Sequence, residues 1–410
     1  MQEFDYLIVG GGLAAASAVD GIRELDSEGS IGVFAEEPDP PYHRPPLSKE
    51  FLQTPEATRE LLQVKPSRWF EDQRGLTLFT STRIDLIDAH ELTVQTEDGD
   101  EVGGGCILIA TGGKPRSLPI PGAELAGVAT LRTAADSEWL RVAATNANRV
   151  VLVGAGFIGM ELASTLNKLN VDTLVVDCET SVWASVFPNK VSAFLQSYFE
   201  ERGVRFLLGA KVTVFEGGGA LSRVLLETGE EIVADLAIVG VGIQPTDDLA
   251  TQAGLAVQDG IVVDVYGETT TARVYAAGDV ARFPDPMKGE LVRTEHWDHA
   301  KAHGKLVGRN MAGAREQYDY LSYFFTHVFD LSISVFGRTA NPDRVIVAGE
   351  LCSGRSVVYC TTNGLLTGTI LINANDAMDE CRKRVRAELS VEDLMKTLDN
   401  PDMKLGEFVG

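Results

Sequence analysis

The sequence predicts an α/β protein with two dinucleotide-binding domains of the Rossmann type and a smaller α+β domain at the C-terminal end. Two glycine-rich turns, at residues 10–15 and 154–159, each follow a short apolar strand and open a helical pattern. After about residue 318 the chain changes to aromatic-rich, alternating segments, which are typical of β-strands. Two turns of this kind indicate that the chain holds two dinucleotides, and a flavin reduced by a nicotinamide is the simplest chemistry that needs both.

The first dinucleotide unit begins at the N-terminus with the apolar strand 6–9. In such a turn the first glycine permits the tight bend, and the second lets the backbone approach a pyrophosphate at a helix N-terminus. Residues 30–35 are expected to form the next strand, and an acid at its end binds ribose hydroxyls. The candidate residues of this unit are Gly10, Gly12, Leu13, Ala14, Glu36 and Glu37.

The second unit repeats this order of elements. The strand 150–153 enters the turn, the strand 171–176 runs into an acid, and the apolar strand 236–239 closes the unit before another glycine. By the same reasoning its candidate residues are Gly154, Gly156, Phe157, Ile158, Gly159 and Asp177. Asp177, with Glu179 two residues on and no arginine in 180–183, favours NADH over NADPH because a 2′-phosphate would meet a carboxylate.

The remaining segments are expected to complete the two units. Residues 37–46 are too rich in proline for a helix. Residues 76–110 are expected to form short strands with a turn at 97–100, and 274–279 another strand that ends in a Gly-Asp turn. A helix is expected after Trp297, with Lys301, Lys305 and Arg309 in one cationic stripe that could guide an acidic partner.

Composition excludes several function classes. The chain has 410 residues, 44% of them hydrophobic, and a formal net charge of −23, which argues against a nucleic-acid partner. No apolar run reaches the roughly 18 residues that a membrane span needs. The first strand begins so early that no signal peptide is expected, and a cytoplasmic location follows.

The five cysteines indicate how electrons leave the flavin. None forms a C-x-x-C pair, and none lies near residues 40–50 or 130–145. A disulfide reductase needs two nearby thiols to relay electrons, so transfer directly from the flavin is expected. No cluster has metal-ligand spacing, and no Gly-x-Ser-x-Gly motif is present, so no metal and no serine nucleophile are expected.

These motifs together resemble those of the flavoprotein family that contains oxygenase-coupled ferredoxin reductases, monodehydroascorbate reductases and apoptosis-inducing factor. The resemblance covers essentially the whole chain and is most specific at residues 42–49, 109–112, 277–279 and 295–300. It implies non-covalent FAD reduced by NAD(P)H in a glutathione-reductase-like arrangement. The FAD domain would comprise 1–113 and 247–318, the NAD(H) domain 114–246, and a C-terminal α+β interface domain 319–410.

The resemblance also implies roles for single residues. Arg44 and Lys49 would meet the FAD pyrophosphate region and the isoalloxazine, and a cation there stabilises the anionic reduced flavin. Glu161 would lie near the nicotinamide amide, and Gly242 under the ring. Lys49, Glu161 and Trp297 are the candidate catalytic residues, whereas His43 and His299 are expected to be structural. Further candidate FAD contacts are Ile84, Ala110, Thr111, Gly112, Arg132, Gly278, Asp279, Glu295, His296 and Phe325.

The family contains more than one activity, and the leading expectation is electron transfer from NADH through FAD to a ferredoxin-type or rubredoxin-like iron protein. A reductase of a small oxidant, monodehydroascorbate or a quinone, is the first alternative. Residues 318–325 and 329–332 resemble the monodehydroascorbate reductase branch, whereas 44–49 fit the ferredoxin reductases at least as well. The second alternative is an NADH-responsive interaction protein like apoptosis-inducing factor.

Overall fold

The computed structural model describes residues 1–287, 289–398 and 405–409, which group into two compact units. The first unit comprises Met1–Arg44, Thr58–Lys114 and Ile243–Tyr320. The second comprises Pro45–Ala57, Pro115–Gly242 and the chain from Leu321 onward. The short segment Pro45–Ala57 therefore groups with the residues expected to bind NAD(H). The expected domain boundaries stay a prediction.

The first unit is built on a mixed sheet in the order β3-β2-β1-β6-β5-β4, with β18 also paired to β6. β1, β2, β3, β6 and β18 pair in parallel, and β4, β5 and β6 form an antiparallel edge. The strands are β1 (Gln2–Val9), β2 (Ile31–Phe34), β3 (Leu76–Phe79), β4 (Ile84–Asp88), β5 (Thr93–Thr96), β6 (Glu101–Ile109) and β18 (Val274–Ala276). This confirms the strands expected within 76–110 and at 274–276.

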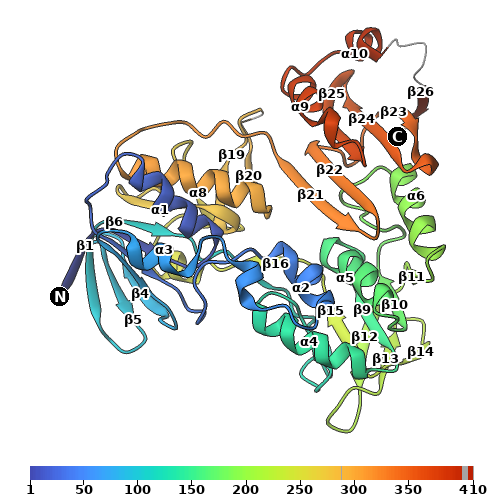
Figure 1. Cartoon of the computed structure of the whole chain (residues 1–410), viewed down its shortest axis with the longest axis horizontal. Helices are drawn as coiled ribbons and strands as arrows, with labels where there is room; N and C mark the ends of the chain where they lie inside the picture. Colours follow the sequence, from blue (N-terminus) through green and yellow to red (C-terminus); the bar gives the residue numbers. More distant parts are fainter. Residues whose placement is uncertain (288, 399–404, 410) are drawn as a thin grey trace. The chain divides into compact units, whose positions relative to one another are not determined.

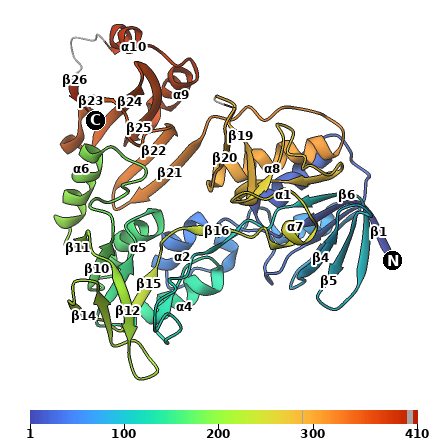
Figure 2. The same ribbon diagram turned by 180° about the vertical axis from the view of Figure 1, so that it is seen from behind.

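Two helices of this unit, α1 (Leu13–Arg23) and α8 (Trp297–Met311), lie side by side (Figures 1 and 2). Their backbones touch because small residues line the contact: a Cβ on Gly304 would lie 2.2 Å from the carbonyl oxygen of Ala14. α8 is the helix expected after Trp297. The other elements of the unit are η2 (Arg59–Leu62), α3 (Ser67–Asp72), α7 (Asp248–Gln252), β17 (Ile261–Val262), η3 (Gly278–Val280), β19 (Ala281–Pro284) and β20 (Leu291–Arg293).

The second unit contains a parallel sheet in the order β11-β10-β9-β15-β8. Its strands are β8 (Val128–Ala129), β9 (Val150–Val153), β10 (Thr173–Asp177), β11 (Arg205–Leu208) and β15 (Leu236–Val239). Its helices are η1 (Pro45–Ser48), α2 (Glu50–Gln53), α4 (Ala134–Asn146), α5 (Phe157–Lys168) and α6 (Asn189–Glu200). An antiparallel sheet is formed by β12 (Val212–Glu216), β13 (Arg223–Leu226) and β14 (Glu231–Val233). The strands β7 (Gly113–Pro115) and β16 (Ile243–Pro245), which fall mainly within the first unit, form a two-stranded sheet.

The C-terminal part is an antiparallel sheet in the order β21-β22-β25-β24-β23-β26, with two helices packed against it (Figure 1). The elements are β21 (Tyr323–Val328), β22 (Leu331–Gly337), β23 (Arg344–Glu350), η4 (Leu351–Ser353), β24 (Arg355–Thr362), β25 (Leu365–Ile372), η5 (Asn375–Ala377), α9 (Met378–Arg386), α10 (Val391–Leu398) and β26 (Leu405–Val409). The α+β class expected for this region is confirmed. β21 also packs against α5.

Candidate functional site: two dinucleotide turns and a buried ion pair

The first glycine turn has the geometry of a pyrophosphate cradle. Gly10 has φ +123°, and a Cβ there would lie 2.2 Å from the carbonyl oxygen of Ala110, so only glycine fits. Gly12 has no neighbour within 4 Å of a Cβ position, which leaves the backbone open to a ligand. Gly12 caps α1 without a side-chain hydrogen bond, so the first N–H groups of the helix are available to an anion.

The second turn repeats this geometry. A Cβ on Gly154, whose φ is +113°, would meet the carbonyl oxygen of Gly240 at 2.5 Å, whereas Gly156 has open space. A Cβ on Gly159 would lie 1.9 Å from the carbonyl oxygen of Gly154, because α5 packs tightly onto its own turn. Ile158 is 36% exposed beside it. The residues present therefore fit one dinucleotide at each turn.

The two acids lie where the strands end. Glu36 is exposed two residues after β2. Asp177 is the last residue of β10, and its carboxylate accepts hydrogen bonds from the backbone N–H groups of Ala155 and Glu179. The contact with Ala155 ties Asp177 directly to the second glycine turn.

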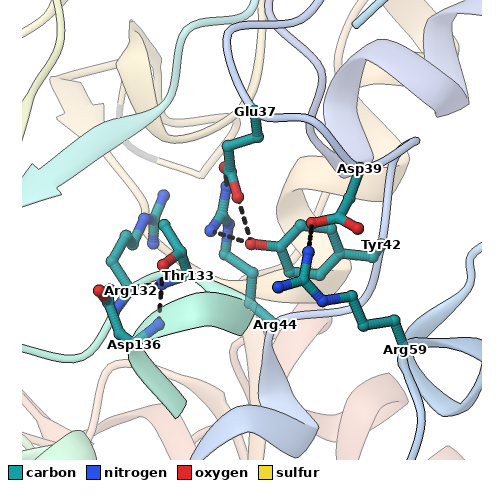
Figure 3. A network of polar contacts seen from close by, with 8 residues as sticks. All are labelled: Glu37, Asp39, Tyr42, Arg44, Arg59, Arg132, Thr133 and Asp136. Carbon is teal, nitrogen blue, oxygen red and sulfur yellow. Dashed lines mark hydrogen bonds and ion pairs between the residues drawn. The ribbon is translucent and has the colours of Figure 1, made fainter. Parts of the chain in front are cut away.

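A charged cluster lies in the segment that follows β2. The Arg44 guanidinium pairs with Glu37 at 2.6 Å and donates to the Tyr42 hydroxyl at 2.9 Å, and the Tyr42 hydroxyl donates to Glu37 (Figure 3). Burial alone would lower the pKa of Arg44, but Tyr42, Glu37 and Asp279 raise it above its ordinary value. Burial lowers the pKa of His296 to about 4, against the opposing charge of Asp279. Arg44, Asp279 and His296 therefore lie within electrostatic reach of one another.

Two further segments of the first unit complete its candidate set. Thr111 donates its hydroxyl to the carbonyl of Thr246 at 2.6 Å, and Gly112 has φ +65°, so this loop turns just after β6. Gly278, with φ +76°, brings the Asp279 loop against Ala14 of α1. Ile84 is buried at the start of β4, and Glu295 pairs with Arg293.

Trp297 has a partner that the sequence did not indicate. Its indole Nε1 donates to His43 Nδ1 at 3.0 Å, and Lys301 Nζ lies 5.3 Å from the centre of the Trp297 ring. His43 therefore acts directly on a candidate catalytic residue. His299, by contrast, is fully buried against Tyr318, whose hydroxyl lies 2.7 Å from His299 Nδ1.

The second unit joins two candidates that the sequence assigned to different cofactors. Lys49 Nζ lies 2.7 Å from a carboxylate oxygen of Glu161, and both residues are buried. Ser48 and Thr326 donate their hydroxyls to the same carboxylate. Sequence reasoning missed both hydroxyls; the only indication for Ser48 was its position beside Lys49 in the 42–49 motif.

The other candidates of this unit lie at element ends. Arg132 is half-buried just before α4, where Thr133 and Asp136 form a capping box (Figure 3). Gly242 has φ +100°, and its carbonyl accepts from the backbone N–H of Arg116 at 2.9 Å. Phe325 is half-buried in β21, 6.0 Å from Tyr323 between ring centres.

The expected cationic stripe on α8 is largely neutralised. Lys305 and Arg309 both pair with Glu24 of α1, and Arg309 also pairs with Glu316. Arg293 pairs with Asp259 and Glu295. Lys301 is exposed, and its described contact is with the Trp297 ring.

Two dinucleotide turns on separate sheets, each with an acid at or just beyond the end of the next strand, are typical of a flavin- and nicotinamide-dependent oxidoreductase. In keeping with this, residues 4–304 match the pyridine nucleotide-disulphide oxidoreductase family, and the chain belongs to that family. It is 32% identical over 400 residues to rhodocoxin reductase of Rhodococcus erythropolis, covering 97% of this chain and 93% of that protein.

Two further likenesses point the same way. The ferredoxin–NAD(+) reductase subunit of the benzene 1,2-dioxygenase system of Pseudomonas putida is 29% identical over 385 residues, covering 94% of this chain and 93% of that protein. The crystal structure of the covalent putidaredoxin reductase–putidaredoxin complex matches with a TM-score of 0.91 and 28% identity, covering 98% of this chain and 96% of that one. The chain is an NAD(P)H-dependent flavoprotein reductase that uses FAD and NAD(H).

Within residues 1–287, 289–398 and 405–409, no three His, Cys, Asp or Glu side chains are grouped so that they could hold a metal ion. No helix in the same ranges is both long and apolar enough to cross a membrane.

Proposed function

We propose that this reductase passes electrons from NADH, through FAD, to a ferredoxin-type iron–sulfur protein. The pair of matched glycine turns, each with an open second glycine, is the observation that carries the two-cofactor part. The acceptor part is supported by relatives whose names specify reductases of ferredoxin. The five cysteines are all free, and Cys106, Cys360 and Cys381 are buried, which also supports transfer that does not pass through a thiol relay.

The residues of the first unit would hold FAD. Gly10 and Gly12 would place the pyrophosphate on the N-terminus of α1, and Glu36 would accept from the ribose hydroxyls. Arg44, already held by Glu37 and Tyr42, would add a fixed positive charge, and Asp279 would accept from a ribityl hydroxyl. Ile84, the 110–112 loop, Gly278, Glu295, His296 and Trp297 are proposed to line the same cofactor.

The residues of the second unit would hold NADH and control charge. Gly156, with Phe157 and Ile158, would seat the nicotinamide dinucleotide on α5, and Asp177 would bind its ribose. When bound, FAD supplies the hydride acceptor and the capacity to release electrons one at a time. Lys49, paired with Glu161, would provide the cation that stabilises the added negative charge. Arg132 and Phe325 remain proposed flavin contacts.

The acceptor is tested by comparing turnover with NADH and four oxidants: a ferredoxin with a two-iron cluster, a rubredoxin, monodehydroascorbate and a benzoquinone. We expect kcat/KM to be far higher for an iron–sulfur or iron protein than for either small oxidant. A higher value with monodehydroascorbate or the quinone would instead assign the chain to small-oxidant reduction. Slow turnover with all four, together with a long-lived reduced flavin, would indicate an NADH-responsive interaction protein.

The expected domain boundaries at 113/114, 246/247 and 318/319 remain part of this proposal.

A cytoplasmic location is also proposed, because NADH is an intracellular reductant. Cell fractionation followed by detection of the flavoprotein tests it, and recovery outside the cytoplasmic fraction would contradict it.

A further inference from the structure

A buried carboxylate in the second unit is held by residues from two other segments of the chain. Glu161 lies in the second turn of α5, shortly after the glycine turn, and is 6% exposed. Lys49, at the end of the 42–49 motif, is 9% exposed, and Thr326 of β21 is fully buried. A buried charge is strongly destabilising unless it is paired and its oxygens are hydrogen-bonded.

The contacts divide between the two carboxylate oxygens. Lys49 Nζ lies 2.7 Å from Glu161 Oε2, which also accepts from the Ser48 hydroxyl. Glu161 Oε1 accepts from the Thr326 hydroxyl at 2.6 Å. The carboxylate can only accept, so the direction of each hydroxyl is fixed. The backbone of Ser48 is itself held, because the Thr165 hydroxyl donates to the Ser48 carbonyl at 2.6 Å.

Thr326 stands out from its surroundings in the C-terminal sheet. A hydroxyl in a fully buried strand position is unfavourable unless it is bonded, and valine would fill nearly the same volume. Thr326 belongs to the hairpin formed by β21 and β22. A second contact joins this hairpin to α5, because the Phe329 N–H donates to the Ser164 hydroxyl at 2.7 Å. Ser164 does not touch Glu161 among the described contacts. The hairpin can therefore be held by Ser164, whereas among its described hydrogen bonds the one from Thr326 reaches the carboxylate.

We infer that Thr326 is a positioning residue of the reductase: it anchors Glu161 Oε1 so that Glu161 Oε2 holds the Lys49 ammonium in place. Without the Thr326 hydroxyl, the carboxylate loses its partner on one oxygen and can rotate away from Lys49. This inference rests on the proposed role of Lys49 at the flavin. It gives the C-terminal domain a part in cofactor chemistry that is separate from any docking of the acceptor.

The test compares Thr326→Val with Thr326→Ser and with Ser164→Ala, each as the FAD-loaded protein. The first readout is the midpoint potential of the bound flavin, which does not depend on turnover. We expect the potential of Thr326→Val to become more negative by about 30 mV, equivalent to a tenfold loss of stabilisation of the reduced form for a two-electron couple. The second readout is flavin reduction at saturating NADH, which we expect to slow about tenfold with the Kd for NADH little changed.

The controls separate positioning from packing. Thr326→Ser retains the hydroxyl and should restore both readouts. Ser164→Ala removes a contact between the hairpin and α5 that does not involve Glu161, so it should lower the melting temperature but leave the potential and the rate unchanged. In a Glu161→Gln background, Thr326→Val should add little, because residues that act through one another are not additive.

A wild-type potential and reduction rate in Thr326→Val would overturn the inference. If Thr326→Val does not fold, Thr326→Ala is measured in the same way, since a smaller side chain avoids overpacking. Both readouts use NADH and flavin alone, so a wrong choice of electron acceptor cannot affect them. A protein that binds no FAD would instead refute the proposed function.

Discussion

At the scale of single residues, each glycine turn contains one glycine that is required by packing and one that leaves space for a ligand. Gly10 and Gly154 are required by φ and by a facing carbonyl, whereas Gly12 and Gly156 are required only if something occupies the open space beside them. A change at an open glycine would therefore affect a cofactor more than the fold.

Glu36→Ala is expected to weaken FAD retention. Glu36 is exposed just beyond β2, where its carboxylate would accept from ribose hydroxyls, and a hydrogen bond to a charged group contributes about 1.5–3 kcal/mol. The FAD dissociation constant, measured by fluorescence quenching, should rise roughly 10- to 150-fold. Glu91→Ala, at an exposed position between β4 and β5, should leave it unchanged. An unchanged constant in Glu36→Ala would remove Glu36 from the FAD site.

NADH is expected to reduce the flavin at least about tenfold more efficiently than NADPH. The 2′-phosphate of NADPH would meet the Asp177 carboxylate, and such a like-charge contact costs several kcal/mol. The structure strengthens the reason: the Asp177 carboxylate is held at the second turn by the N–H groups of Ala155 and Glu179. Stopped-flow reduction with both nucleotides measures the preference. Asp177→Asn should reduce the preference for NADH over NADPH, and Glu179→Gln should reduce this preference less. Equal efficiencies in the wild type would show that Asp177 does not meet the ribose.

His43 is expected to control Trp297 through its protonation state. Burial, and then the charge of Lys301, lower the pKa of His43, so Nδ1 stays free to accept from the Trp297 indole at neutral pH. At low pH His43 becomes protonated and can no longer accept the hydrogen bond from Trp297. Turnover with the electron acceptor should therefore fall at low pH. Lys301→Met raises the pKa of His43, so the fall should begin at higher pH. Identical pH profiles in Lys301→Met and wild type would contradict this account.

At the scale of elements, the sequence predicted best where a motif fixes the backbone. The strands beside both glycine turns, the short strands within 76–110 and the helix after Trp297 all formed where expected. β25, α9 and α10 were not predicted. The apolar run of β25 does not distinguish strand from helix without tertiary contacts, and the 9 residues of α9 and the 8 residues of α10 are too few for a helical period to be clear. The Glu161 cluster could not be predicted either, since Ser48 and Thr326 lie 113 and 165 residues from Glu161 in sequence.

The contact between α1 and α8 is expected to tolerate no side chain at Gly304. In Gly304→Ala the new Cβ would lie 2.2 Å from the Ala14 carbonyl oxygen, and the obstacle is backbone rather than a mobile side chain. Because α1 carries the first glycine turn, its displacement should weaken FAD binding as well as stability, by roughly 1–3 kcal/mol for overpacking. Thermal unfolding and FAD retention measure both effects. Gly218→Ala, which has open space around its Cβ, is the matched control and should change neither.

At the scale of the whole molecule, the net charge of −23 has consequences for the acceptor. Iron–sulfur partners that are themselves acidic would be repelled at long range, and the neutralisation of Lys305 and Arg309 by Glu24 leaves little of the α8 stripe to attract them. Docking would then depend on short-range contacts, and moderate salt should reduce the repulsion.

Acid is expected to destabilise the first unit through its buried histidines. Burial lowers the pKa of His296 to about 4 and that of His303 to about 3, and it holds the pKa of His299 well below its usual range. Asp279 faces His296, and Phe283 and Tyr318 pack on His299 and His303. Among the described residues, Nε2 of His299 and of His303 has no hydrogen-bond partner, so nothing there compensates a proton.

The sign of this effect follows from which state binds protons first. Unfolded histidines protonate near pH 6.5. In the folded state His296 has a pKa of about 4 and His303 a pKa of about 3, and burial holds the pKa of His299 well below its usual range. The unfolded state therefore binds up to three more protons in this window, and the free energy of unfolding should fall by up to about 4 kcal/mol per pH unit as pH decreases. Well above pH 6.5 these histidines are neutral in both states, so they should not make the free energy of unfolding depend on pH. The urea midpoint of FAD release, measured from pH 7.5 to 5, tests this. His299→Gln with His303→Gln should flatten the dependence and the exposed His90→Gln should not; an equally steep dependence in the double variant would place the acid sensitivity elsewhere.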